Sequence, residues 1–181
     1  MIDPAINGIA QATLALIFLS SAVEKAKDLS WFADVLRQYR LVPESAVWPV
    51  AFAIPATELA AAAGLLYAPL QVVAAVVLIG LLLAFSFAVG INLARGRHHI
   101  DCGCWGPGAQ RSELSGWLVV RNLALAAVAS LLLVPLVARE ILWVDFLTVG
   151  LATVTLLFLF GSTNRLIANA SKLANLRRSH D

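Results

Sequence analysis

Uncharged stretches dominate the chain, and short charged stretches separate them. Charged residues are absent from four long runs, which are 4–23, 59–94, 122–138 and 146–164. The second of these runs is long enough for two crossings and is interrupted by Tyr67-Ala68-Pro69. Because a helix needs about 20 apolar residues to cross the hydrocarbon core of a bilayer, the runs predict membrane spans. Five spans are expected, at about 5–24, 46–66, 69–92, 114–137 and 141–161.

The spans do not alternate apolar and polar residues, as the strands of a membrane barrel do. We therefore expect an all-α fold, a polytopic transmembrane helix bundle of four to five spans, with five preferred, that forms a single domain over 1–181. Apolar residues make up 60% of the chain and charged residues 13%, against about 25% charged residues in an ordinary soluble domain. This composition excludes soluble, disordered and nucleic-acid-binding proteins. Asp3 and the lack of a basic residue before the first span predict that this span is retained and not cleaved as a signal peptide.

The segment after the first span predicts a short amphipathic helix. Phe32, Val35, Leu36 and Tyr39 recur at helical spacing behind Ser30, which is a candidate N-cap. Such a helix either lies on the membrane surface or packs on the other helices, and the pattern alone favours neither.

Basic residues concentrate on one side of the predicted spans. The side that holds the first loop carries eleven of the 13 basic residues, while Arg139 lies on the other side and Arg121 lies within the fourth span. Because cytoplasmic loops are enriched in lysine and arginine, this side is expected to be cytoplasmic, with the N-terminus outside and the C-terminus inside. The expected location is the inner (cytoplasmic) membrane of a bacterium, as a multi-pass protein.

The loop between the third and fourth predicted spans holds the candidate chemistry. It contains both cysteines of the chain, Cys102 and Cys104, with Gly103 between them. Glycine allows the backbone turn that brings two such sulfurs together. The small ring that they close would be strained, so its disulfide should exchange easily. Thiol–disulfide exchange is therefore the favoured interpretation of this loop.

The neighbours of the two cysteines bear on their reactivity. Arg97, and His98 or His99 when protonated, would favour a thiolate, whereas Asp101 would oppose it. Two other interpretations stay open. The histidines and cysteines together suit zinc or copper, although their spacing matches no zinc framework and we assign no metal. The cysteines would otherwise simply pack a tight loop.

Two charges and an amide are predicted inside the membrane. Glu58 lies near the midplane of the second span, and Arg121 and Asn122 lie in the fourth. Intramembrane charges are costly unless they are paired or functional. An ion pair between Glu58 and Arg121 is the favoured interpretation, and a proton or quinone site at Glu58, with a hydrogen bond from Asn122, is the alternative. Asp145 is expected near the outer side, where Arg139 would neutralise it.

Several segments resemble one family of membrane proteins. The specific part is Asp101-Cys102-Gly103-Cys104-Trp105-Gly106, which follows Asn92-Leu93-Ala94-Arg95-Gly96-Arg97. Weaker parts are Pro55-Ala56-Thr57-Glu58-Leu59 and Leu19-Ser20-Ser21-Ala22-Val23-Glu24-Lys25. Together they resemble the methylamine-utilisation protein MauE family, which is related to the DoxX-like proteins. Trp105 stands where family members often carry phenylalanine, so the aromatic ring is kept.

The resemblance implies an integral membrane thiol-redox or maturation protein. The implied client is a periplasmic, disulfide-rich protein, the small subunit of methylamine dehydrogenase, and the implied partner is a thioredoxin-like periplasmic protein. If the chain is an enzyme, it is a thiol–disulfide oxidoreductase, with Cys102 favoured as the attacking thiol because it lies nearer the histidines. The alternatives are a non-enzymatic assembly scaffold and a metal or small-molecule transporter.

The expected orientation and the implied client conflict. The basic residues place Cys102 and Cys104 at the cytoplasmic face, whereas the client is periplasmic. Three arrangements would resolve this: a loop that folds into the bundle, a quinone that carries the electrons, or an inverted topology. No cofactor is certain, and a quinone is the candidate. The expected partners besides the two proteins are the lipid bilayer and no nucleic acid.

Overall fold

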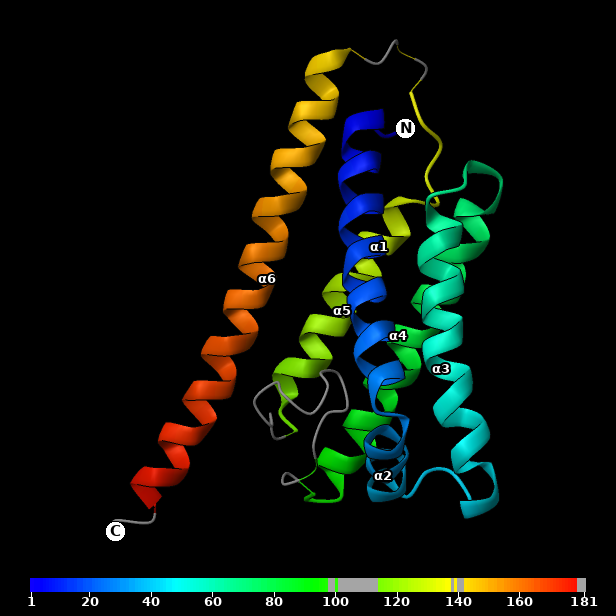
Figure 1. Ribbon diagram of the computed structural model, residues 1–181. Coiled ribbons are helices and arrows are strands. Elements are labelled where there is room, and N and C mark those ends of the chain that lie inside the picture. The colour runs from blue at the N-terminus through cyan, green and yellow to red at the C-terminus, as the bar shows by residue number, and fades with distance from the viewer. Residues whose placement is uncertain (98–99, 101–113, 138, 140–141, 179–181) are drawn as a thin grey trace.

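The computed structural model describes residues 1–97, 100, 114–137, 139 and 142–178, with side chains as far as residue 166. These residues form a bundle of helices (Figure 1). The helices are α1 (Pro4–Lys27), α2 (Leu29–Tyr39), α3 (Glu44–Leu65), the short 3₁₀ helix η1 (Ala68–Leu70), α4 (Gln71–Ala94), α5 (Gly116–Leu131) and α6 (Trp143–Arg178). Within the described part of the chain, the β-pairing is a single isolated bridge between Ile2 and Leu136.

The helices confirm the predicted class, a helical membrane bundle. Four segments are long and apolar enough to cross a membrane, namely Pro4–Lys27, Glu44–Leu65, Ala68–Ala94 and Trp143–Leu166. The fifth apolar helix, α5, has 16 residues, so it rises about 24 Å. An apolar helix is therefore present at each of the five predicted places, and the one at the fourth place is short.

The fourth predicted span was drawn too long, because α5 ends at Leu131 and not near 137. Pro135 explains this early end, since proline has no N–H to donate and disfavours the helical conformation in the residue before it. Beyond the last turn, the chain pairs with the N-terminus. The amide of Ile2 donates to the carbonyl of Pro135 at 3.0 Å, and the amide of Val137 donates to the carbonyl of Ile2 at 2.9 Å.

The start of α2 differs from the sequence prediction by two residues. The N-cap is Asp28 and not Ser30, because a carboxylate oxygen of Asp28 accepts from the amide of Trp31 at 2.9 Å. The hydroxyl of Ser30 donates to the same oxygen at 2.6 Å. These two hydrogen bonds lower the pKa of Asp28, so Ser30 supports the cap that it was expected to form.

The apolar face of α2 packs on protein. Phe32, Val35 and Tyr39 are buried, as the helical spacing predicts. Phe32 and Ala33 form a cluster with Val47 and Ala51 of α3. Of the two placements that the sequence left open, the structure therefore shows the one in which the helix packs on its neighbours.

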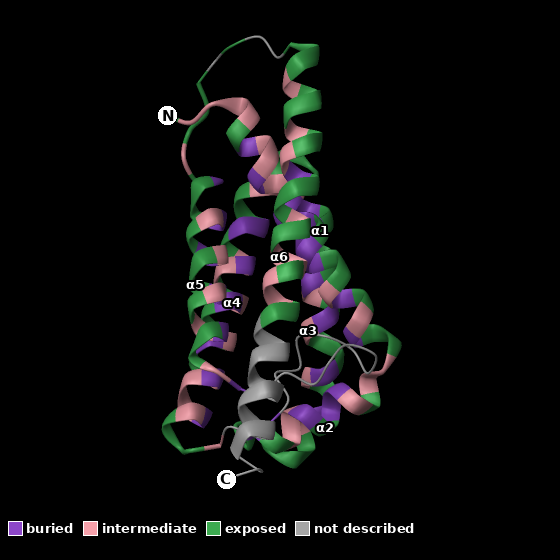
Figure 2. Cartoon of the chain, turned by 90° about the vertical axis from the view of Figure 1, so that its left-hand side faces the viewer, coloured by how far each residue is buried: buried purple, intermediate pink, exposed green. Residues whose placement is uncertain are grey.

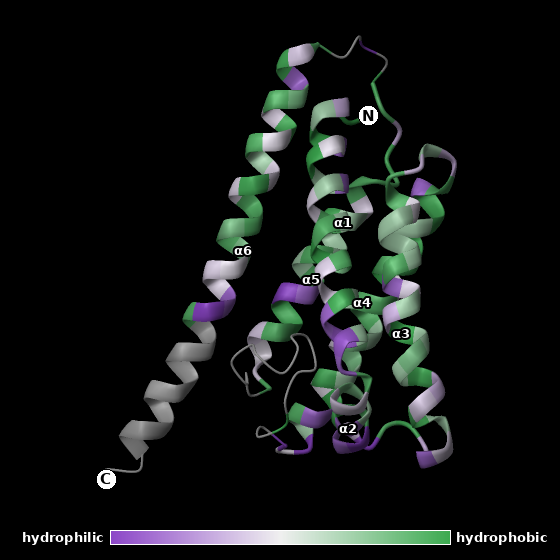
Figure 3. Cartoon of the chain, viewed as in Figure 1, coloured by the Kyte–Doolittle hydropathy of each residue, from purple (hydrophilic) through white to green (hydrophobic). Residues whose placement is uncertain are grey.

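The core of the bundle lies between α1, α3, α4 and α5, and α6 stands at its edge. The largest cluster of buried side chains draws on those four helices and the turn after α5, with Leu14, Leu65, Leu78 and Ala129 among its members. Figures 1 and 2 show α6 as a long helix at the side of the bundle, with mostly exposed residues. Only 6% of its most apolar window is buried, and Figure 3 shows that this stretch is largely hydrophobic. A lipid-facing helix has this pattern.

Arg139 forms ion pairs with aspartates at the starts of α1 and α6. The guanidinium of Arg139 donates to both carboxylate oxygens of Asp3 at 2.8 Å and to those of Asp145 at 2.8 and 2.9 Å. Arg139 lowers the pKa of Asp3 and the two aspartates raise that of Arg139. The expected neutralisation of Asp145 by Arg139 is therefore confirmed, and Asp3 joins the pair.

The bundle has two distinct ends (Figure 1). One end holds the N-terminus, η1 and the Arg139 cluster. The other holds α2, the C-terminus of α4, the N-terminus of α5 and the C-terminal end of α6. These ends correspond to the two sides that the basic residues distinguish, and the cytoplasmic assignment of the second stays a prediction.

Candidate functional site

The predicted cysteine loop is described only at its two ends. Arg97, Ile100 and Leu114 are described, whereas the other candidate residues of the loop lie outside the described residues: His98, His99, Asp101, Cys102, Cys104 and Trp105. The thiol-exchange, metal and packing interpretations of this loop are therefore untested. What the structure does define is how each end of the loop is held.

A glycine ends α4 and directs the chain into the loop. Gly96 adopts a left-handed conformation with φ of 72°. Its amide donates to the carbonyl of Leu93 at 2.9 Å, and the amide of Arg97 donates to the carbonyl of Asn92 at 3.0 Å. This pair of bonds is the Schellman arrangement, which needs a left-handed residue and therefore favours glycine. Arg97, a predicted neighbour of the thiols, is thus held within the cap of α4.

Ile100 anchors the start of the loop in a hydrophobic cluster. Its exposed fraction is 9%, although it lies in a loop and only two residues before Cys102. The cluster contains residues from α2, α4 and the start of α5: Val35, Tyr39, Val89, Leu114 and Leu118. Leu114 is the first described residue after the loop, so one cluster holds both ends. The role of α2 as part of this support could not be read from its own periodicity.

Glu58 forms a buried ion pair with a lysine of α1. The ammonium nitrogen of Lys25 lies 2.9 Å from each carboxylate oxygen of Glu58. The side chains are 4% and 1% exposed, respectively. Lys25 also donates to the hydroxyl of Ser21, which lies 3.4 Å from the same carboxylate. The predicted partner of Glu58 was Arg121, so the identity of the partner is corrected to Lys25.

The first span was predicted to end near residue 24, so Lys25 was expected to lie just beyond it, on the basic side. Figure 1 shows why it reaches Glu58: α2 lies beyond the end of α1, beside the first turns of α3. The last turn of α1 therefore lies level with Glu58, which is well inside α3. A signal for this was present, because Leu14, Phe18, Ala22 and Lys25 recur at helical spacing and all four are buried. Lys25 continues the buried stripe of α1.

Aromatic rings complete the surroundings of Lys25. Its ammonium lies 5.7 Å from the ring centroid of Phe32 and 5.6 Å from that of Phe85. Rings at this distance stabilise a cation through their electron-rich faces. The buried charge is thus met by a carboxylate, a hydroxyl and two rings, which offsets the cost of removing it from water.

Arg121 links α5 to α6. Its guanidinium donates to the side-chain oxygen of Asn164 at 3.3 Å and to that of Asn122 at 3.3 Å. Its central carbon lies 5.6 Å from the ring centroid of Phe160. Because Asn164 and Phe160 belong to α6, this arginine supplies polar contacts between the core and the edge helix.

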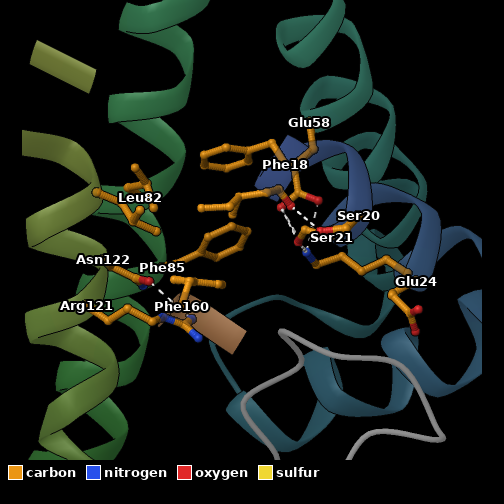
Figure 4. A pocket seen from close by; sticks show the side chains of 13 residues that line it. Phe18, Ser20, Ser21, Glu24, Glu58, Leu82, Phe85, Arg121, Asn122 and Phe160 are labelled. Carbon is orange, nitrogen blue, oxygen red and sulfur yellow. Dashed lines mark hydrogen bonds and ion pairs between the residues drawn. The ribbon is translucent and has the colours of Figure 1, made fainter. Parts of the chain in front are cut away.

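The Lys25–Glu58 pair and the contact between Arg121 and Asn122 face a common cavity (Figure 4). The cavity has a volume of about 50 Å³, and part of it is open to the outside. Its lining includes Ser21 and Glu58 on one side and Arg121 and Asn122 on the other. Lys25, the ion-pair partner of Glu58, also lines it. The structure therefore brings together the three predicted intramembrane residues, Glu58, Arg121 and Asn122, in one cavity rather than in one ion pair.

The described residues contain no group of three or more histidine, cysteine, aspartate or glutamate side chains that would hold a metal ion. The cavity offers instead a neutralised charge pair, an arginine, an amide and aromatic surfaces.

Comparison with known proteins gives a consistent result. The family model described as methylamine utilisation protein MauE matches residues 4–135. A protein of Paracoccus denitrificans named methylamine utilization protein MauE is 41% identical over 129 residues, which are 71% of this chain and 69% of that one. Its namesake in Methylophilus methylotrophus is 38% identical over 127 residues, or 70% and 67% of the two chains. No solved structure matches.

The similarity extends beyond the family model in one relative. A protein of the same name from Methylorubrum extorquens is 36% identical over 166 residues, which are 89% of this chain and 87% of that one. An alignment of this length necessarily includes part of α6, whereas the family model ends before it.

Proposed function

This chain belongs to the MauE family of methylamine utilisation proteins, and from that premise we propose that it is a thiol–disulfide exchange protein. Its proposed reactive groups are Cys102 and Cys104. The proposed role is to support disulfide formation in a periplasmic client, the small subunit of methylamine dehydrogenase. A thioredoxin-like protein is the proposed partner that exchanges disulfides with this chain and with the client.

The observation that carries the proposal is the support of the cysteine loop. Both cysteines of the chain lie in this loop, and no other thiol competes with them. Ile100, two residues before Cys102, is buried against α2, α4 and α5 together with Leu114 at the far end of the loop. A reactive pair must be presented to a partner in a defined position, and side chains locked by packing provide such positions.

The proposed exchange transfers two electrons and two protons. In the oxidised chain, a thiolate of the partner attacks the sulfur of Cys102 and releases Cys104 as a thiolate, which takes up a proton. The second thiolate of the partner then attacks the mixed disulfide and releases the Cys102 thiolate. The partner leaves with a disulfide, and Cys102 and Cys104 remain as thiols. Re-oxidation of the pair requires an electron acceptor.

Substitution of each cysteine tests the proposal. We expect Cys102→Ser and Cys104→Ser each to abolish disulfide formation in the client, measured by alkylation and gel shift of the dehydrogenase small subunit. In the reverse direction, in which the Cys102 thiolate attacks the disulfide of an oxidised partner, Cys104→Ser should accumulate a mixed disulfide, because Cys104 is then the thiol that resolves it. Gln110→Ala is the control in the same loop. If the double serine variant matures the client as well as the wild type does, the chain is a non-enzymatic scaffold and the proposal is wrong.

Labelling with a membrane-impermeant maleimide decides the face of the loop. Labelling in intact cells would place the thiols beside the periplasmic client and would overturn the orientation predicted from the basic residues. Labelling only in opened vesicles would keep that orientation and exclude direct contact with a periplasmic partner. The same cells with and without reductant report whether the pair is oxidised.

A further inference from the structure

Asn92 lies in the last turn of α4 and is completely buried, with an exposed fraction of 0%. Its side-chain amino group donates to the carbonyl of Ala88 at 3.0 Å, one turn earlier in the same helix. Its side-chain oxygen receives no hydrogen bond from the residues that the structure describes. A buried oxygen of this kind is costly until a donor meets it.

The face of α4 that carries Asn92 packs in the cluster that holds the cysteine loop. Val89 lies three residues earlier, on the same face, and is a buried member of that cluster. Ile100 belongs to the same cluster. The chain therefore turns back after α4 and packs beside the face on which Asn92 lies. Because a helical side chain leans toward the N-terminus of its helix, Asn92 points toward the depth of this cluster.

The two cysteines follow closely on this anchor. Cys102 comes two residues after Ile100, and two residues span at most about 7 Å. Each residue from Ile100 to Cys104 has a backbone N–H, because proline does not occur before Pro107 in this loop. Hydrogen-bond donors are therefore available within a short length of chain from the cluster.

The other end of the loop carries a second buried oxygen. Ser115 is the N-cap residue of α5, but its side chain makes no cap hydrogen bond. Its hydroxyl oxygen is buried and has no partner within the described part of the chain. Ser115 follows Leu114, which packs in the same cluster as Ile100. Unmet polar atoms thus occur where both ends of the loop join the bundle, as is expected if the loop itself supplies their partners.

We propose that Asn92 is a positioning residue for the thiol pair. Its side-chain oxygen accepts a hydrogen bond from a backbone N–H of the segment that carries Cys102 and Cys104. The inference rests on the proposed function for its purpose, because a fixed loop serves thiols that meet a partner. Asn92 touches no reacting atom. It joins the loop to α4, so that the sulfurs keep one position relative to the bundle.

The test is the rate at which the reduced thiols react with 4,4′-dithiodipyridine, in the purified full-length chain in lipid nanodiscs. A loop that has lost one buried hydrogen bond is released more often, and its thiols then meet the reagent more often. We expect Asn92→Leu to react about fivefold faster than the wild type. Ser86→Ala is the matched control and should react at the wild-type rate. Ser86 is also a buried polar residue of α4, but its hydroxyl donates to the carbonyl of Leu82 in the same helix.

Asn92→Asp separates the hydrogen bond from the packing. At about pH 4.5 a buried carboxyl is protonated, so it can donate to Ala88 and offer its second oxygen to the loop, as the amide does. At this pH, Asn92→Asp should react as slowly as the wild type, whereas Asn92→Leu should stay about fivefold faster. A side chain that only fills space would give the wild-type rate in both variants. If Asn92→Leu does not fold, Asn92→Ala carries the same prediction.

Two outcomes would overturn the inference. Equal rates in the wild type and Asn92→Leu would mean that the loop does not bond to this oxygen. Equally fast rates in Asn92→Asp and Asn92→Leu at about pH 4.5 would mean that packing, and not a hydrogen bond, holds the loop.

The proposed function is judged separately, by maturation of the client in the serine variants of Cys102 and Cys104. If those variants mature the client while Asn92→Leu still speeds up the thiol reaction, the loop is held as inferred and the thiol-exchange function is wrong. If maturation requires the cysteines and the rates in the Asn92 variants do not change, the function stands and the inference is wrong.

Discussion

The Lys25–Glu58 pair gives the sharpest test of the structure. At 2.9 Å, two unit charges attract by about 6 kcal/mol at an effective dielectric constant of about 20. Removal of each ion from water costs several kcal/mol, so the pair as a whole contributes little net stability. Removal of one partner is different, because it leaves the other charge buried and uncompensated. We expect Lys25→Met and Glu58→Met each to lower the free energy of unfolding by about 3–5 kcal/mol.

The double variant distinguishes an interacting pair from two independent losses. If the pair interacts, Lys25→Met with Glu58→Met should cost less than either single change, since no charge is then left behind in the bundle. Unfolding in mixed micelles, titrated with a denaturing detergent, measures these free energies. The matched control is the exposed pair of Lys27 and Glu24, which are 3.5 Å apart with side chains 64% and 33% exposed. The same double-mutant cycle there should show a coupling of no more than about 0.5 kcal/mol.

Additive effects of the two single changes at Lys25 and Glu58 would refute this reasoning. Additivity would mean that the two side chains do not interact, and therefore that α1 and α3 are not aligned as described. Exchange of the two charges, Lys25→Glu with Glu58→Lys, gives a further check. It should recover part of the stability that either reversal alone removes.

Three further predictions concern the ends of the bundle. Arg139 lowers the pKa of Asp3, so the stabilisation from this contact is present above the unfolded pKa, near 3.8, and is lost as the pH falls through the lower folded value. The protection factor of the Ala5 amide, which is its exchange rate relative to the intrinsic rate at the same pH, should therefore fall in strong acid in the wild type. In Asp3→Asn the protection factor should already be low at neutral pH and should change little on acidification. Gly96→Ala should cost about 1 kcal/mol of unfolding free energy, from its φ of 72° alone, since a Cβ there meets no atom within 4 Å; an unchanged stability would argue against the left-handed cap. Ile100→Ala should raise the rate at which the two loop thiols react with maleimide while the unfolding of the bundle changes little, and an unchanged rate would mean that Ile100 does not position the loop.

Much of the fold follows from local patterns. The charge-free runs predict where apolar helices occur, because the cost of a charge in hydrocarbon acts on each segment separately. The spacing of Phe32, Val35 and Tyr39 predicts the buried face of α2, because that face also depends only on residues within one segment. The end of α5 was missed although its signal, Pro135, is also local. The cysteine loop remains a prediction from the sequence and from family membership.

The polar site depended on relations between helices that no local pattern contains. The sequence predicts that Lys25 is a loop residue on the basic side. It predicts that Glu58 is an isolated charge whose candidate partner is Arg121. Both predictions fail because α2 lies beyond α1, which places the end of α1 deep in the bundle. Periodicity specifies which face of a helix is buried, but not the depth at which that helix sits against its neighbours. That depth is decided by the packing of all the helices together, and it selected Lys25 as the partner of Glu58 and left Arg121 and Asn122 to line the cavity.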